Sequence, residues 1–408
     1  MFQKFKYLIL IIKMFILINF FLNINKNLII KINDTIAYIN VKKELRKINS
    51  YFELCNNFKF ILKKEIKKSN NPKISIISPV YNRERYIIKL IKSIQYQNFN
   101  DIEIIFVDDF SIDNSIKKIE EIKKNDKRII LSVYYLKIIN IFMEINIEKI
   151  LKNKKNKGTF ICRNIGVQFS KGKYIILPDP DDILSKNILK ICYNLAEKYK
   201  YEMIRFVQCI KITKMRISDL IYKKSKSIYQ PELSFYIFYG NNELQIVDFF
   251  INNKFIKKSI YIKSLRILNN SYLNMYIICF EDQIINYIIH RICKSYFFLN
   301  KVGYYYIRNS ISITGNQFKI SKLNIKFIFI YLKILFEFSK NNKYEKDMAN
   351  IFLSNMLQNY NFKNIFLKIG KKDFNKYYKK LVNKYLKNKF ISNENKYLLN
   401  YKKYDFKF

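Results

Sequence analysis

Clusters of carboxylates are the residues of this sequence that could do chemistry. Asp108-Asp109 directly follows the apolar run IEIIFV, Asp179-Pro180-Asp181-Asp182 follows KYIILP, and Glu281-Asp282 opens the helical pattern DQIINYIIHRI. A single Asp after a strand is explained by its preference for turns and helix starts. Three acids within four positions repel one another and normally require a cation between them. The segment 179–182 is therefore predicted to hold a divalent metal ion.

The sequence lacks the motifs of several other common active sites. The sequence has no GxGxxG, GxxxxGK[ST], HExxH or GxSxG, which disfavours dinucleotide, P-loop, zincin and α/β-hydrolase sites. The only histidine is His290, eight residues after Asp282, and we expect a partly buried helix residue rather than an extra metal ligand. The six cysteines form no CxxC pair and no zinc spacing, so we expect buried free thiols.

The elements that must position these acids alternate along the chain. Short β-branched runs predict strands, and apolar residues at helical spacing predict helices between them. The alternation indicates an open, mostly parallel α/β sheet flanked by helices, in which ligands bind at the carboxyl ends of the strands. The predicted strands are 73–78, 102–107, 128–133, 173–177 and 201–207, and the predicted helices include 84–97, 113–124 and 186–200.

The strongly basic composition says little about partners. The 408 residues carry a formal net charge of +43, with 65 Lys but only 10 Arg and three Ala. Residues encoded by AT-rich codons dominate the composition. Proteins that recognise nucleic acids favour Arg for bidentate contacts to the bases. We therefore attribute the charge to codon composition and expect no specific nucleic-acid partner.

The segments outside the α/β region are harder to assign. Residues 7–22 form an apolar run interrupted by Lys13, which is short for a membrane span. A signal anchor in residues 1–30, a cleaved signal and a soluble amphipathic helix remain open, so the chain is expected either at a membrane, such as that of the ER or Golgi, or in the cytoplasm. Residues 31–71 suggest a stem with some helix, 132–151 an apolar insertion or a translated intron, and 315–408 a helical C-terminal extension.

Three ordered motifs resemble those of family 2 glycosyltransferases. They are PKISIISPVYNRERYI, SIQYQNFNDIEIIFVDDFSIDNS and RNIGVQFSKGKYIILPDPDD, and the resemblance covers the stretch from Pro72 to about Thr314. It implies a GT-A fold, which is Rossmann-like, over residues 72–314. Two positions depart from the family pattern: Phe110 replaces a small residue, often Gly, and Pro180 stands inside the D-x-D.

The resemblance also implies roles for the residues of the nucleotide pocket. Pro79, Tyr81 and Asp109 would line the site for uracil and ribose, and Asp108 would join them or support the turn. Arg163 and Asn164 would lie near the nucleotide or its phosphates; the alternative for Arg163 is a surface position at a helix start.

For the reacting groups, the resemblance implies metal and base roles. Asp179 and Asp181 form the D-x-D, with Asp181 favoured as the direct ligand of Mn²⁺ or Mg²⁺ through the diphosphate. Asp182 would contact the donor sugar or support the loop. Asp282 would be the general base, with Glu281 second.

The function expected from these roles is an inverting, divalent-metal-dependent sugar transfer. The donor would be a nucleotide-sugar, with UDP favoured, and the acceptor a hydroxyl of a glycan, lipid or protein. The alternatives are a GT-A scaffold that has lost turnover and a basic protein that binds polyanions. A sugar nucleotidyltransferase is disfavoured because its Gly-rich loop is replaced by SPVYNRE.

Overall fold

A computed structural model describes residues 65–132, 156, 158–210, 226–229, 250–273, 281–307, 334 and 337. The predictions for residues 1–30, for nearly all of the insertion at 132–151 and of the extension at 315–408, and for the stem before residue 65 lie outside these ranges. Within the described ranges, no helix has the length and apolar character needed to cross a membrane.

A single mixed sheet organises the described part of the chain, and it contains nine strands there. The strand order is β3-β2-β1-β4-β8-β6-β9-β5, and β7 pairs with β9. The strands are β1 (Ile74–Val80), β2 (Ile102–Asp108), β3 (Ile129–Ser132), β4 (Tyr174–Ile176), β5 (Ile183–Leu184), β6 (Met203–Ile210), β7 (Lys226–Tyr229), β8 (Lys254–Lys257) and β9 (Ser295–Tyr306).

The α/β class predicted from the sequence is confirmed, and the parallel arrangement holds for one half of the sheet. Strands β3, β2, β1 and β4 are parallel neighbours. In the other half β8 runs antiparallel between β4 and β6, while β6 and β9 are parallel. The tyrosine run 304–306 forms the end of β9.

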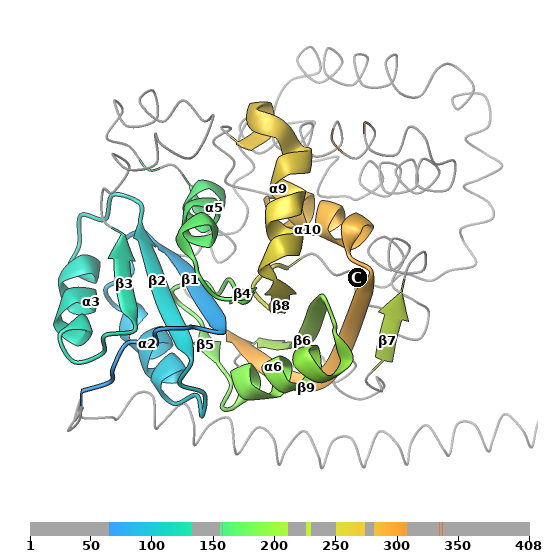
Figure 1. Ribbon diagram of the computed structural model, residues 1–408. Coiled ribbons are helices and arrows are strands. Elements are labelled where there is room, and N and C mark those ends of the chain that lie inside the picture. The colour runs from blue at the N-terminus through green and yellow to red at the C-terminus, as the bar shows by residue number, and fades with distance from the viewer. Residues whose placement is uncertain are drawn as a thin grey trace, which may run out of the picture.

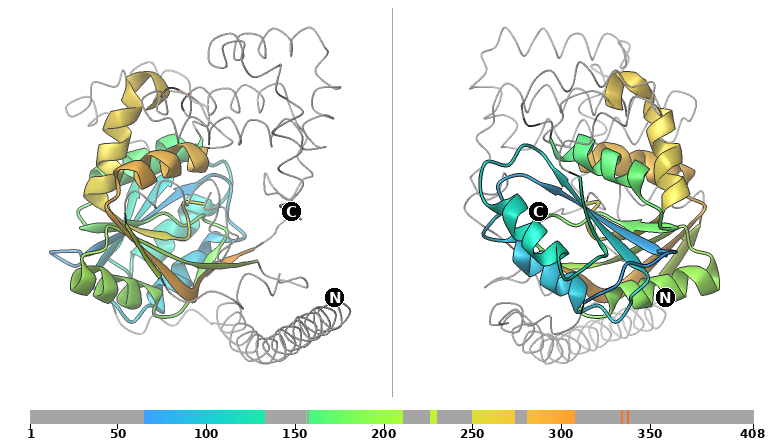
Figure 2. Two further views of the ribbon diagram at one scale, coloured as in Figure 1. Left: turned by 90° about the vertical axis from the view of Figure 1, so that its right-hand side faces the viewer. Right: turned by 60° about the vertical axis from the view of Figure 1, so that its left-hand side comes forward.

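Helices cover both faces of this sheet. Figures 1 and 2 show α5 (Thr159–Phe169), α9 (Lys258–Leu273) and α10 (Glu281–Ile292) on one face. The opposite face carries α2 (Ile87–Gln95), α3 (Ser115–Lys123) and α6 (Ile188–Tyr199). Helix α2 begins three residues later than predicted because the preceding loop is tied to residues 111–115, where Asn82 N donates to Ser111 Oγ at 3.0 Å and Arg83 N to Ser115 Oγ at 2.7 Å.

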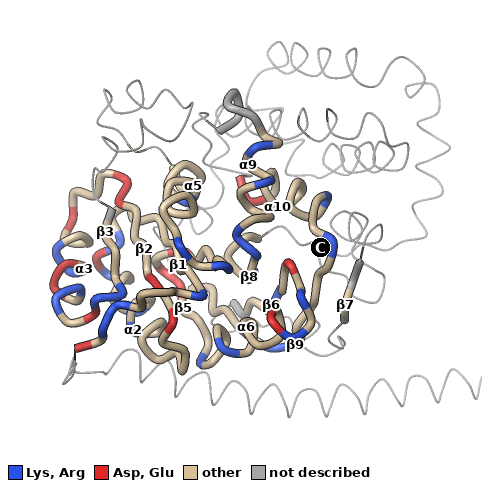
Figure 3. The backbone as a smooth tube through the Cα atoms, in the orientation of Figure 1, with Lys and Arg blue, Asp and Glu red and all other residues tan. Residues whose placement is uncertain are grey.

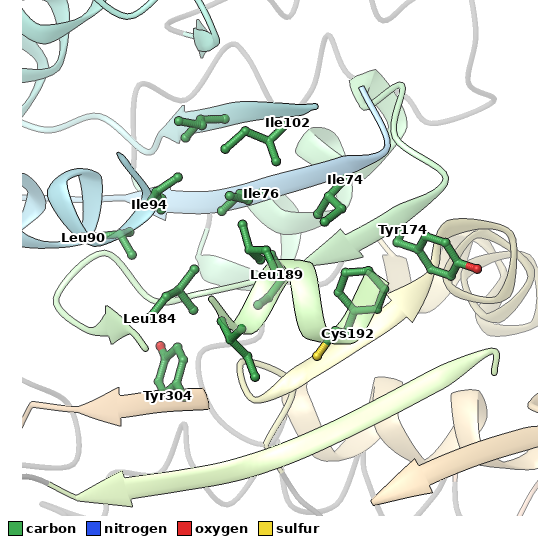
Figure 4. Packing of buried hydrophobic residues seen from close by; sticks show 14 of the residues in the cluster. Ile74, Ile76, Leu90, Ile94, Ile102, Tyr174, Leu184, Leu189, Cys192 and Tyr304 are labelled. Carbon is green, nitrogen blue, oxygen red and sulfur yellow. The ribbon is translucent and has the colours of Figure 1, made fainter. Parts of the chain in front are cut away.

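The core lies between the sheet and the helices α2 and α6. All seven residues of β1 are buried, as expected for a central strand with helices on both faces. Ile76, Ile94 and Leu189 meet in this core, and Tyr304 of β9 lies beside Leu184 of β5 (Figure 4). Each such buried aliphatic side chain stabilises the fold by about 1.5–3 kcal/mol relative to an exposed one.

A glycine sets the distance between α5 and the sheet. A Cβ atom on Gly166 would lie 2.2 Å from Ile77 Cγ2 and 3.3 Å from Val107 Cγ2. Atoms of that size cannot approach so closely, so α5 reaches its position only because residue 166 has no side chain. Packing therefore requires glycine at position 166, the last residue of the motif RNIG.

Several minor predictions can be checked against the described residues. His290 is buried in α10, with Nδ1 2.7 Å from Asn286 O, which confirms the interpretation as a helix histidine. Cys162, Cys192 and Cys293 are buried free thiols, as expected. Figure 3 shows basic and acidic residues interspersed along the described backbone, for example on α3.

Candidate active site

The carboxyl ends of three neighbouring strands bring two of the acidic clusters together. Strand β1 lies between β2 and β4 and is parallel to both, so the residues that follow these strands emerge at one edge of the sheet. Asp109 follows β2, and its N–H donates to Val80 O at 2.7 Å. Its Oδ2 accepts a hydrogen bond from Gly158 N at 2.8 Å, which ties this edge to the start of α5.

The loop after β2 has an unusual backbone conformation at Phe110. Its φ is 66°, in the left-handed region that glycine adopts at little cost and a bulky residue rarely occupies. This conformation gives a physical reason for the small residue, often Gly, that the family pattern carries at this position.

Arg163 lies at the centre of the site. Its Nη1 is 2.6 Å from Asp282 Oδ1 and its Nη2 is 2.6 Å from Asp179 Oδ1, and Glu281 Oε1 is 3.8 Å from Nη1. The residue is only 3% exposed, so the alternative of a surface Arg at a helix start is wrong: Arg163 lies on α5 and faces inward. One guanidinium thereby joins the loop after β4 to the first turn of α10.

Burial sets the protonation behaviour of the two α10 carboxylates. Burial and the neighbouring Asp282 together raise the pKa of Glu281 to about 7, against the opposing effects of Arg163 and of a 2.8 Å hydrogen bond from Thr159 Oγ1. Burial likewise raises the pKa of Asp282, against the opposing charge of Arg163. Burial acts to lower the pKa of Arg163, but the carboxylates of Asp282, Asp179 and Glu281 raise it overall. The site thus contains one carboxylate, Glu281, able to exchange a proton near neutral pH, and a permanently charged cation, Arg163.

Tyr304 of β9 stabilises the loop 179–182 through two hydrogen bonds. Tyr304 Oη donates to Asp182 Oδ2 at 2.6 Å and accepts from Asp179 N at 2.9 Å. Asp182 also accepts from Ile307 N at 2.8 Å and is fully buried. Burial and the neighbouring Asp179 and Asp181 raise the pKa of Asp182, and the hydrogen bonds only partly oppose this. In this structure Asp182 supports the loop, one of the two roles expected for it.

Asp179 and Asp181 of the D-x-D have different surroundings. Both carboxylate oxygens of Asp179 accept hydrogen bonds, Oδ1 from Arg163 and Oδ2 from Asn252 Nδ2 at 3.0 Å. Asp181 is 8% exposed and pairs with Arg83, whose Nε lies 3.6 Å from Oδ2. The described residues contain no group of three or more His, Cys, Asp or Glu side chains that could hold a metal by themselves.

The remaining residues predicted for the nucleotide pocket lie on β1, on the loop after it, on β2 and on α5. Pro79 is buried near the end of β1, and Tyr81, in the loop that follows, is 41% exposed. Asp108 ends β2, its carboxylate accepts from Ser111 N at 3.2 Å, and burial raises its pKa. Asn164 is 7% exposed and its Oδ1 accepts from Tyr261 Oη of α9 at 2.9 Å. Asn164 therefore holds α5 and α9 together in this structure.

Sequence reasoning missed several residues of the site. Asn252 and Thr159 carried no recognisable signal, because each is an isolated polar residue in an Asn- and Lys-rich chain. Arg83 stood in the first motif without an assigned role, and Tyr304 lies outside all three motifs. Their partners lie on elements far away in sequence, which is why spacing alone could not find them.

The architecture and this edge of the sheet define a GT-A fold. Residues 1–349 of S. aureus TarS, in a crystal structure with UDP-GlcNAc, have a similar fold, with a TM-score of 0.56 and 15% sequence identity over 77% of this chain and 80% of that one.

The sequence comparisons point to one family. Residues 75–133 and 141–264 match the family described as glycosyl transferase family 2. An uncharacterized glycosyltransferase of Rickettsia conorii is 35% identical over 132 residues, which are 32% of this chain and 18% of that protein. The minor teichoic acid biosynthesis protein GgaB of Bacillus subtilis is 33% identical over 138 residues, 33% of this chain and 13% of that protein. Residues 75–133 and 141–264, just under half of the chain, are thus similar to glycosyl transferase family 2, and the chain matches less than a fifth of the length of these two relatives.

Proposed function

We propose that this chain transfers a sugar from a nucleotide-sugar, with UDP as the nucleotide, to a hydroxyl of an acceptor. The observation that carries the proposal is the position of Arg163, 2.6 Å from Asp179 after β4 and 2.6 Å from Asp282 on α10. The first acid belongs to the loop expected to receive the donor, and the second to the pair expected to receive the acceptor. A sugar transfer needs these two sites side by side, and the fold brings them to one guanidinium. The donor preference is supported by the family and by the UDP-GlcNAc bound to the structurally similar TarS.

We further propose that a divalent ion, Mn²⁺ or Mg²⁺, binds with the donor at Asp181. Such ions use oxygen ligands and are commonly held by one or two carboxylates together with substrate phosphates. The residues fit this requirement, because Asp181 lies at the strand-end edge while the oxygens of Asp179 are hydrogen-bonded to Arg163 and Asn252. When bound, the ion would stabilise the charge that develops on the departing diphosphate. Asp179 then acts in positioning and not as the first ligand.

The acceptor is activated in this proposal by a carboxylate of α10. The acceptor O–H transfers its proton to Asp282, with Glu281 as the second candidate, while the oxygen forms a bond to the anomeric carbon. The bond from that carbon to the diphosphate oxygen breaks on the opposite face, so the configuration inverts. Burial supports this role, because it raises the pKa of both carboxylates toward the pH at which a base is most effective. An α-linked product from an α-linked donor would contradict inversion.

Two further proposals concern the acceptor and the cellular location of the chain. We propose a glycan, lipid or protein hydroxyl, and the relation to a teichoic acid biosynthesis protein supports a polymer acceptor. We also propose that residues 7–22 associate the chain with a membrane. Flotation of the full chain with liposomes, compared with a chain lacking residues 1–30, tests this: equal flotation of both would contradict it.

The donor site is tested by calorimetric titration of the full chain with UDP, with and without Mn²⁺. We expect Mn²⁺ to strengthen binding by about tenfold or more, which corresponds to about 1.4 kcal/mol. Asp181→Ala should abolish this dependence on Mn²⁺, whereas Asp101→Ala should keep it, because Asp101 is exposed at the other end of β2. If the wild type bound UDP equally well with and without Mn²⁺, the metal proposal would be contradicted. If it bound no UDP at all, the proposal that UDP is the donor nucleotide would be contradicted.

A turnover measurement separates an enzyme from a scaffold. Slow hydrolysis of UDP-GlcNAc, UDP-glucose or UDP-galactose, lost in Asp282→Asn, is the expected result. Intact binding of UDP without hydrolysis of any of the three would favour the scaffold alternative.

A further inference from the structure

The side chain of Asn252 has an acceptor atom without a partner beside the catalytic carboxylates. Asn252 lies directly before β8 and is 3% exposed. Its Nδ2 donates to Asp179 Oδ2 at 3.0 Å, while its Oδ1 is buried and has no hydrogen-bond partner. A buried carbonyl oxygen without a donor is unfavourable, so native structures rarely keep one unless a ligand or water satisfies it.

The orientation of this amide follows from its neighbour. Turning the amide by half a rotation would place Oδ1 of Asn252 against Oδ2 of Asp179, two acceptors at 3.0 Å. The bond to Asp179 therefore directs the amide oxygen away from that carboxylate. The backbone around it is anchored, since Ile251 N donates to Asp282 Oδ2 at 3.4 Å and Phe206 N donates to Asn253 O at 3.1 Å. The acceptor is thus held in place before any ligand arrives.

The neighbours of Asn252 indicate what kind of group would satisfy it. Asp179, its bonded partner, belongs to the loop that carries Asp181, and its side chain keeps 26% of its surface exposed. On the other oxygen of Asp179 lies Arg163, whose Nε is also buried without a partner. An acceptor and a donor around one carboxylate suit a hydroxyl group, which both donates and accepts. The bond to Asp179 places the pair on the donor side of the site.

From this geometry we infer that Asn252 is a sugar-contacting residue: its Oδ1 accepts a hydrogen bond from a hydroxyl of the donor sugar. The inference rests on the proposed function and adds to it a residue outside the three sequence motifs. It makes Asn252 a determinant of affinity for the sugar part of the donor and not for its nucleotide part.

The test compares the affinities of the full-length protein for UDP and for a UDP-sugar, in the presence of Mn²⁺. The probe is whichever of UDP-GlcNAc, UDP-glucose and UDP-galactose the wild type binds most tightly. In Asn252→Ala we expect affinity for this probe to fall about three- to tenfold, the range for one lost neutral hydrogen bond. Affinity for UDP should stay within about twofold, because UDP carries no sugar.

Two further variants control the interpretation. Asn252→Asp keeps an oxygen acceptor but loses the donor to Asp179, so the ratio of the two affinities should stay nearer to wild type than in Asn252→Ala, even if both are weakened. Asn253→Ala removes an equally buried neighbour whose Oδ1 already has a partner, Lys254 Nζ at 3.4 Å, and should leave the ratio unchanged.

Each contrary result has a separate meaning. An equal loss for UDP and for the UDP-sugar in Asn252→Ala would overturn the inference, because the residue would act only by positioning Asp179. Unchanged affinities would also overturn it and would assign the amide oxygen to an ordered water. If the wild type bound neither probe, the proposed function itself would fail.

Discussion

Replacing Arg163 by Met tests whether one buried cation holds the site together. Met has a similar length but no charge, so Asp179, Glu281 and Asp282 would lose their common positive partner. Removing one member of a buried ion pair typically costs about 3–5 kcal/mol. Asp179 and Asp282 keep 26% and 21% of their side-chain surface exposed. Water therefore screens part of the uncompensated charge, and we expect the lower end of the range, about 3 kcal/mol.

The loss in Arg163→Met should depend on pH in a defined direction. The pKa of Glu281 is raised from an ordinary 4.5 to about 7, so this residue contributes stability at low pH and loses that contribution as the pH rises through about 7. Without Arg163 the pKa values of Glu281 and Asp282 should rise further, because the cation lowers both. The variant should therefore lose less stability at about pH 5 than at about pH 8, since protonation removes the repulsion.

Urea denaturation of the full chain at both pH values measures this effect. Arg128→Met is a matched control, because Arg128 is 2% exposed and pairs with the buried Asp126 at 2.9 and 2.8 Å, at the start of β3. We expect comparable destabilisation in the control, with affinity for UDP unchanged in its folded state. A loss in Arg163→Met below about 1 kcal/mol, the level of an exposed ion pair, or an equal loss at both pH values would refute the reasoning.

Two further predictions concern Tyr304 and Gly166, which support the site without belonging to its carboxylate clusters. Tyr304→Phe keeps the ring in the core but removes the bridge from Asp182 Oδ2 to Asp179 N; it should cost about 1–3 kcal/mol in urea denaturation and weaken Mn²⁺-dependent binding of UDP, and intact binding would show that the brace does not affect the donor site. Gly166→Ala should cost about 1–3 kcal/mol because its Cβ would lie 2.2 Å from Ile77 Cγ2, and a change within about 0.5 kcal/mol would mean that α5 shifts freely.

The elements of the α/β half could be predicted from the sequence because their signals are local. The runs that became β1 and β2 are mostly apolar and rich in Ile and Val, and such runs are typical of strands buried on both faces. The acids at 108–109, 179–182 and 281–282 could be found for the same reason, since their clustering is visible without knowledge of the fold. Strand β5 escaped prediction because it contains only two residues, and β7 (KSIY) and β8 (KFIK) because half of their four residues are polar or charged.

The relations between these acids were decided only by the tertiary structure. Composition and spacing indicated carboxylates able to bind a cation, and the family resemblance supplied their expected roles, but nothing local showed that Arg163 would turn inward between Asp179 and Asp282. That contact joins residues 16 and 119 positions apart, and it exists because Gly166 lets α5 approach the sheet. Tyr304 and Asn252 entered the site in the same way. The sequence alone thus determined which chemical groups the site contains, whereas close packing of distant elements determined which of them touch, because hydrogen bonds and ion pairs act over a few ångströms in space regardless of separation along the chain.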